Sequence, residues 1–162
     1  MSTSLVELAQ AYIQSEWPKR QARAEERLNR LNEKYGIGGD WRLIQPGPIA
    51  EACSIWVEET AQLGRDLVEH ILNHPEARPL LTQADQVEHL RQFVSDWMIE
   101  REDATVIARV KAFMAARGIK GDQEIAIMRA RAQSQLARAR KEILLKIYQA
   151  TRPVSRTARA RR

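Results

Sequence analysis

Residues 48–73, PIAEACSIWVEETAQLGRDLVEHILN, decide the fold. Pro48 favours the first turn of a helix, because proline lacks the N–H that a first turn leaves unpaired. Apolar and small residues then recur every three or four positions, which predicts a helix with a wide buried face. Gly64 on this face would let another helix approach closely. The full face comprises Ile49, Cys53, Trp56, Val57, Thr60, Leu63, Gly64, Leu67, Val68 and Ile71.

Three other segments, 4–35, 82–117 and 122–150, show the same helical spacing. Breaks rich in Gly, Pro or polar residues separate the segments at 36–48, 75–81 and 118–122. Residues 41–44 are the one candidate strand, and they are short. The pattern therefore predicts an all-α fold, a helical bundle of about four to six helices with a basic C-terminal helix and tail.

Local signals predict where these helices begin and break. Ser4 and Glu7 form a capping-box pattern at the first helix. Pro18 lacks a backbone donor, so we expect a kink or break just before it. The polar run at 100–103 interrupts the third segment, and Asp103 would cap a second helix there. Asp122 is expected to be the N-cap of the last helix.

The periodic positions also predict the core and the domain organisation. Residues 1–150 are expected to form one domain, with 4–35 as a helical hairpin or coiled-coil arm, 48–150 as the main bundle, and 151–162 as a basic, flexible tail. The arm carries a narrow apolar stripe that is hard to bury alone, which predicts self-association or another protein subunit as partner. That stripe is Ala24, Leu28, Leu31 and Tyr35, and the predicted core is Trp56, Leu67, Ile71, Leu90, Val94, Trp97, Leu136 and Ile143.

Composition excludes several classes of protein. The chain has 162 residues, of which 44% are hydrophobic and 29% charged, so wholesale disorder is excluded. No apolar run approaches the 18–20 residues, roughly, that a membrane span needs, and no secretory signal is visible. A single cysteine cannot form an internal disulfide, which fits a reducing compartment. We therefore expect a bacterial cytoplasmic protein.

Charge is distributed unevenly along the chain. Residues 1–103 carry 18 acids and 11 bases, a net charge of −7, whereas residues 104–162 carry 3 acids and 15 bases, a net charge of +12. Twenty of the 26 bases are arginine, which grips phosphate or carboxylate in a planar fork. The basic end therefore indicates a polyanion or an acidic protein surface as partner.

The last helix and the tail concentrate this charge, with 11 bases against one acid in residues 125–162. Phosphate contacts supply most non-specific affinity for nucleic acid, so we expect largely sequence-independent binding of DNA or RNA by an accessory or structural subunit. The predicted nucleic-acid-binding residues are Arg129, Arg131, Arg138, Arg140, Lys141, Lys146, Arg152, Arg156, Arg159, Arg161 and Arg162.

Other interpretations of the basic end remain open. In the main alternative the protein is an adaptor without nucleic acid, whose basic region docks on an acidic protein surface or on another copy. A membrane-surface helix would need a bulky apolar face, but Ala132 and Ala139 interrupt this one, so we expect no membrane partner. Residues 110–131 also resemble a helix-turn-helix weakly, although Glu124 stands where an apolar residue is usual.

Catalytic and metal-binding patterns are weak throughout. His70 and His74 stand four positions apart, a spacing that can chelate a metal, but no Cys lies nearby and the pattern is not H-E-x-x-H, so we interpret them as histidines favoured at a helix C-terminus. Cys53 falls on the apolar face and is expected to be a small core residue. The carboxylates of residues 58–103 are interpreted as solvated faces or as salt-bridge partners of the basic helix. We expect no enzyme activity, no metal and no cofactor, unless a site is assembled from scattered residues.

Overall fold

The computed structural model describes residues 3–35, 47–119 and 121–151. Every regular element in these ranges is helical, which confirms the predicted all-α helical bundle. The predicted strand at 41–44 lies outside the described residues. The elements are α1 (Leu5–Tyr35), α3 (Gly47–Asn73), the 3₁₀ turn η1 (Leu80–Thr82), α4 (Ala84–Arg101), the π-helical turn η2 (Glu102–Ile107), α5 (Ala108–Ala115) and α6 (Asp122–Ala150).

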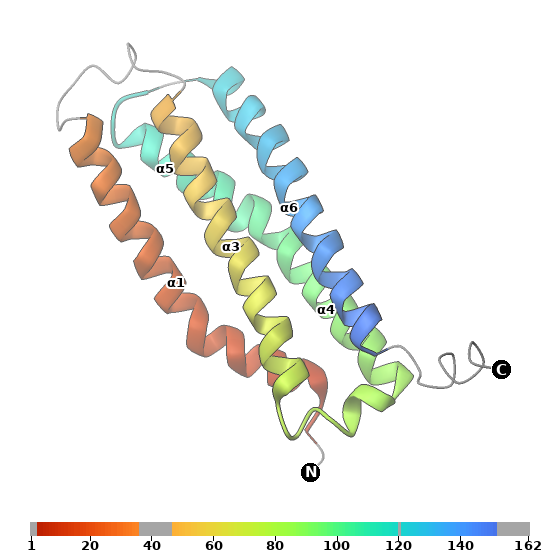
Figure 1. Ribbon diagram of the computed structural model, residues 1–162. Coiled ribbons are helices and arrows are strands. Elements are labelled where there is room, and N and C mark those ends of the chain that lie inside the picture. The colour runs from red at the N-terminus through yellow and green to blue at the C-terminus, as the bar shows by residue number, and fades with distance from the viewer. Residues whose placement is uncertain (1–2, 36–46, 120, 152–162) are drawn as a thin grey trace.

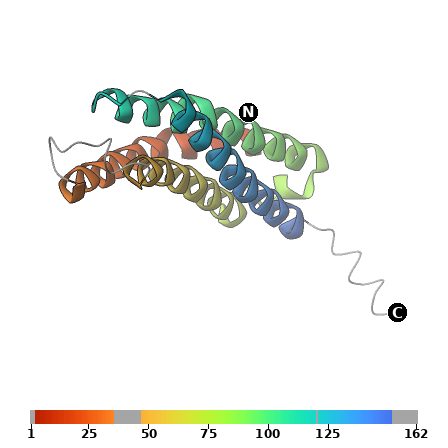
Figure 2. The same ribbon diagram turned by 90° about the horizontal axis from the view of Figure 1, so that it is seen from above.

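The long helices enclose one core. α1 packs against α3 and α4, α6 packs against the same two helices, and α3 and α4 also contact each other. Figures 1 and 2 show this arrangement, with α6 crossing obliquely between α3 and α4. Of the predicted core, Trp56, Leu67, Ile71, Leu90, Val94, Leu136 and Ile143 are buried. Trp97 is half-buried instead, and its ring packs edge-on against that of Trp17, which is also half-buried, with 5.5 Å between the ring centroids.

Three predicted helix boundaries are wrong. α1 runs through Pro18 without a break, so the expected break is wrong, while the expected kink stays a prediction; the missing donor of Pro18 costs one hydrogen bond. Asp103 caps nothing, because the π-helical turn η2 joins α4 directly to α5. The N-cap of α6 is Gly121, and Asp122 is the first helical residue.

Other helix ends follow their local sequence closely. The Ser4 hydroxyl accepts a hydrogen bond from the Glu7 N–H at 3.0 Å, and the Glu7 carboxylate accepts one from the Ser4 N–H at 3.2 Å, which confirms the capping box. At the end of α5, Gly118 has a φ of +66°. The Gly118 and Ile119 N–H groups donate to the carbonyls of Ala115 and Met114, the two bonds of a Schellman motif.

The narrow stripe of α1 is covered by the chain itself. Ala24, Leu28 and Leu31 are all buried, and α3 is the helix that α1 contacts most. The side chain of Tyr35 lies outside the described residues. The narrow stripe on α1 is therefore no reason to expect self-association. Binding of a second copy or of another protein subunit stays a prediction.

Gly64 allows close contact between α3 and α6, as predicted. A Cβ atom at this position would lie 2.8 Å from Cδ1 of Ile143 and 3.4 Å from Sδ of Met98. Both neighbours are buried, so the absence of a side chain at Gly64 sets how closely α6 and α4 approach the middle of α3.

Candidate nucleic-acid interface

Packing of α6 determines which of its charged residues face outward. The buried positions of this 29-residue helix recur every three or four residues and form one narrow face toward α3 and α4. The polar residues between them are left on the flanks and on the outer face. The buried positions are Met128, Ala132, Leu136, Ala139, Ile143 and Ile147.

Two of the predicted nucleic-acid-binding residues are held in ion pairs within the bundle. Arg129 is paired with Asp103 of η2, and the Lys146 ammonium lies 3.1 Å from the Glu69 carboxylate of α3. All four side chains are substantially exposed, so these pairs reduce the local charge without contributing much stability. A polyanion would have to compete with Asp103 and Glu69 for these two bases.

Four other predicted bases of α6 make no ion pair with the described residues: Arg131, Arg138, Arg140 and Lys141. We call these four the α6 basic set. Arg140 is half-buried beside α4, and the other three are exposed. The predicted residues Arg152, Arg156, Arg159, Arg161 and Arg162 lie outside the described residues.

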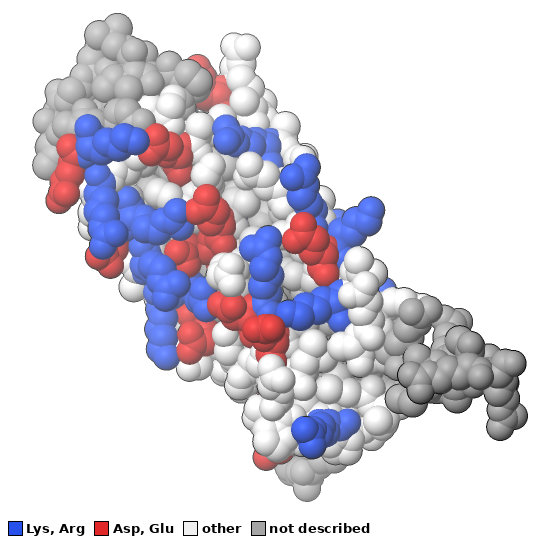
Figure 3. Space-filling view, viewed as in Figure 1, with Lys and Arg blue, Asp and Glu red and all other residues white. Residues whose placement is uncertain are grey.

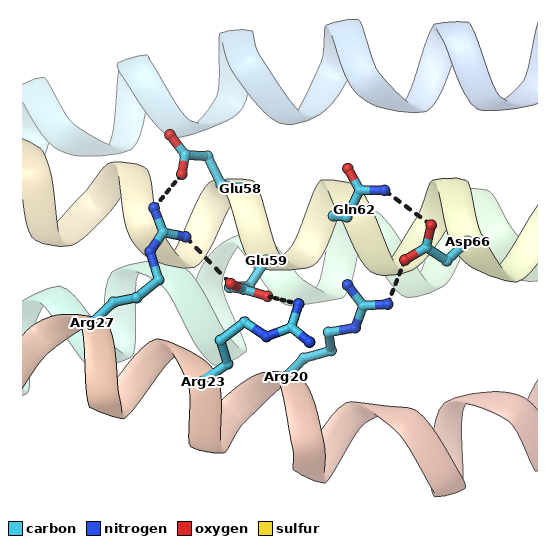
Figure 4. Close-up of polar contacts among 7 residues, drawn as sticks. All are labelled: Arg20, Arg23, Arg27, Glu58, Glu59, Gln62 and Asp66. Atoms are coloured by element: carbon cyan, nitrogen blue, oxygen red, sulfur yellow. Dashed lines mark hydrogen bonds and ion pairs between the residues drawn. The ribbon is translucent and has the colours of Figure 1, made fainter.

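Most acids of α3 pair with α1 rather than with α6, contrary to one of the expectations for them. Figure 3 shows basic and acidic side chains interleaved over α1 and α3. Figure 4 shows the ladder that joins these helices, in which Arg20 pairs with Asp66 and Arg27 bridges Glu58 at 2.5 Å and Glu59 at 3.2 Å. Because α1 neutralises these acids, they leave the charge of the α6 basic set uncompensated.

Burial makes this ladder a structural element. The side chains of Arg20 and Glu59 are 9% and 6% exposed, which is unusual for charged groups. Burial alone would lower the pKa of Arg20, but the hydrogen bond and the charge of Asp66 outweigh it and raise that pKa above the ordinary value. The ladder therefore stabilises the packing of α1 on α3.

A groove of about 560 Å³ runs between α4 and the C-terminal half of α6. Arg91 of α4 lines it together with Arg140 and Lys141 of α6. Its apolar wall includes Leu144, Leu145 and Tyr148. The sequence patterns did not indicate Arg91 or Tyr148 as site residues, because only the packing of α4 on α6 brings them together.

The other candidate sites are structural or incomplete. The rings of His70 and His74 lie 5.3 Å apart, and His70 also stacks on Tyr12. No group of three or more His, Cys, Asp or Glu side chains within the described ranges could hold a metal ion. Cys53 is buried as expected, and burial raises the pKa of its thiol.

Two of the alternative interpretations can be compared with the fold. α5 packs chiefly against α3 rather than against α6, and α6 with its 29 residues is far longer than the recognition helix of a helix-turn-helix. Over the ranges that the structure describes, the helices lack the combination of length and apolar character needed to cross a bilayer.

Comparison of the chain with protein-family models, with curated proteins and with solved structures gives no match.

Proposed function

We propose that this protein is a non-enzymatic nucleic-acid-binding subunit that contacts the phosphate backbone through the outer face of α6 and the tail that follows it. The observation that supports this proposal best is the α6 basic set. Its four charges lie on one helix, and no described acid pairs with them. The sequence adds five arginines and no acid over residues 152–162.

These nine bases are enough for strong non-specific binding. Each phosphate contact to duplex DNA lowers the slope of log affinity against log salt by about 0.9, and each contact to a single strand by about 0.7. Six contacts would then reduce affinity roughly a thousandfold for duplex, and about three-hundredfold for a single strand, between 50 and 200 mM salt. Contacts of this kind read backbone rather than base edges, so the proposed binding depends little on sequence.

The direct test removes three charges from the proposed surface. The variant Arg138→Gln, Arg140→Gln, Lys141→Gln should bind labelled oligonucleotides more weakly. The slope of its log affinity against log salt should be less steep by about 0.9 for each duplex phosphate that it no longer neutralises. The side chains are exposed or half-buried, so the helical circular dichroism spectrum should not change.

A matched control distinguishes this surface from net charge alone. The variant Lys19→Gln, Arg30→Gln, Lys111→Gln removes the same charge from exposed positions of α1 and α5. It should bind almost as tightly as the unaltered chain. Equal weakening of the two variants would show that net charge, rather than the α6 surface, governs binding.

A second candidate function is supported by exposed apolar side chains. Ile99, Ile127, Leu145 and Tyr148 are each 46–55% exposed, and Leu145 and Tyr148 lie together on one side of α6, where an aromatic residue beside apolar surface is typical of protein interfaces. On this account the protein is an adaptor whose basic region docks on an acidic partner or another copy. The α6 substitutions would then dissociate a protein complex, and no nucleic acid would bind.

A further inference from the structure

The groove between α4 and α6 combines positive charge with apolar surface. Among the described residues, its lining includes three bases from two helices, Arg91, Arg140 and Lys141, and no acid. Anions are therefore favoured in it over cations. The apolar wall beside these bases would suit a ligand that carries flat apolar groups as well as charge.

Arg91 has hydrogen-bonding capacity left for such a ligand. Its ion pair with Glu88 has a separation of 3.5 Å, which is at the limit of a hydrogen bond. Its Nε atom is buried and has no hydrogen-bond partner among the described residues. A ligand can contact only the exposed part of this guanidinium, since Nε is covered, and the side chain as a whole is 38% exposed.

Tyr148 supplies a surface for stacking. Its side chain is 46% exposed at the end of the groove. Lys141 lies seven residues earlier on the same helix, roughly 10 Å away along the axis at about 1.5 Å per residue. About three nucleotides at about 3.4 Å each would cover this distance, with phosphates near the basic side chains and one nucleobase on the tyrosine ring.

The acids of α4 favour a single strand over a duplex. Asp85, Glu88, Asp96 and Glu100 are exposed and form a row along the outer face of α4, and Glu88 stands one turn before the groove residue Arg91. A single strand can lie within the groove, against α6. A duplex is wider, and its second strand would bring phosphates over the acidic row, where like charges repel.

We propose that this groove binds single-stranded nucleic acid, with Tyr148 stacking on a base and with Arg91, Arg140 and Lys141 contacting phosphates. The proposal rests on the proposed function and adds to it a strand preference, an aromatic contact and a contact from α4. It assigns Arg91 to the interface, although the charge pattern of the sequence did not.

The test measures fluorescence anisotropy at 50 mM salt with labelled dT12, U12 and a 12-base-pair duplex. The full chain should bind the single strands more tightly than the duplex, and the dT12 and U12 arms distinguish DNA from RNA. Tyr148→Ala should weaken single-strand binding about five- to 150-fold, the range for removal of one base–aromatic stack, and should leave duplex binding unchanged. Tyr148→Phe keeps the ring and should bind like the unaltered chain.

Matched variants outside the groove complete the experiment. Ile127→Ala removes an equally exposed apolar side chain of α6 that does not line the groove, and it should have no effect. Duplex binding equal to or tighter than dT12 binding, or equal effects of Tyr148→Ala and Ile127→Ala, would overturn the proposal and leave the proposed function standing. A dimer that Tyr148→Ala dissociates would also overturn it, because the groove would then be an interface between copies. Failure of every oligonucleotide to bind would remove the proposed function itself.

Discussion

Gly64→Ala tests the closest helix contact in the core. The added Cβ would lie 2.8 Å from Cδ1 of Ile143, so the buried isoleucine must rotate or α6 must shift. Overpacking of this kind costs about 1–3 kcal/mol, while replacing a helical glycine with alanine gains about 1 kcal/mol. We therefore expect a net loss of roughly 1 kcal/mol in the free energy of unfolding.

A double-mutant cycle isolates the contact from helix propensity. Ile143→Val removes Cδ1 and should cost about 1 kcal/mol alone, but in the Gly64→Ala background it also relieves the clash. The two substitutions should therefore couple by about 1–2 kcal/mol in urea denaturation followed by circular dichroism. Ile147→Val, one turn further along α6, should show no coupling with Gly64→Ala. Additivity of Gly64→Ala and Ile143→Val within about 0.3 kcal/mol would refute the close approach of α6 to Gly64.

Three further predictions concern stability. Leu136→Ala should cost about 2–5 kcal/mol because Leu136 is buried, whereas Leu145→Ala, half exposed on the same helix, should cost under about 0.5 kcal/mol in the same denaturation assay. Arg20→Ala should lower the free energy of unfolding by about 1–3 kcal/mol, because it removes a buried hydrogen bond between charged groups. Arg30→Ala, which removes an exposed ion pair, should lower it by about 0.5 kcal/mol or less. Equal losses in the two variants would contradict a structural role for the ladder. Burial and a neighbouring histidine lower the pKa of His70, so the folded state binds its proton less readily than the unfolded state. Unfolding free energy should therefore fall as the pH drops below about 6.5, less so in a His70→Gln variant.

Helical periodicity was sufficient to predict most of the fold. The breaks at 75–81 and 118–122 and the buried face of α3 follow from local spacing and from residues with strong turn preferences. Pro18 and Asp103 indicated the wrong boundaries because tertiary packing keeps α1 unbroken and a π-helical turn joins α4 to α5. Local preferences of single residues are weak beside the packing of a whole helix face.

The candidate site was less predictable because charge pairing is a long-range property. The basic character of α6 is visible in the sequence, but nothing in it shows that Arg129 and Lys146 are paired while Arg131 and Arg138 have no ion pair with the residues that the structure describes. Pairing depends on which acids neighbouring helices bring within reach, and α1 takes up most of those on α3. The groove residue Arg91 comes from another helix, so it too required the packed structure.

The most direct test of the proposed function is the salt dependence of nucleic-acid binding by the full chain. Anisotropy titrations between 50 and 200 mM salt should show affinity falling roughly three-hundredfold to a thousandfold, as six phosphate contacts require. Deletion of residues 152–162 should make affinity depend less steeply on salt, and it should not lower the melting temperature. The deletion keeps Thr151, whose hydroxyl donates a hydrogen bond of 2.8 Å to the Ile147 carbonyl at the end of α6. Absence of any binding to DNA or RNA at 50 mM salt would contradict the account.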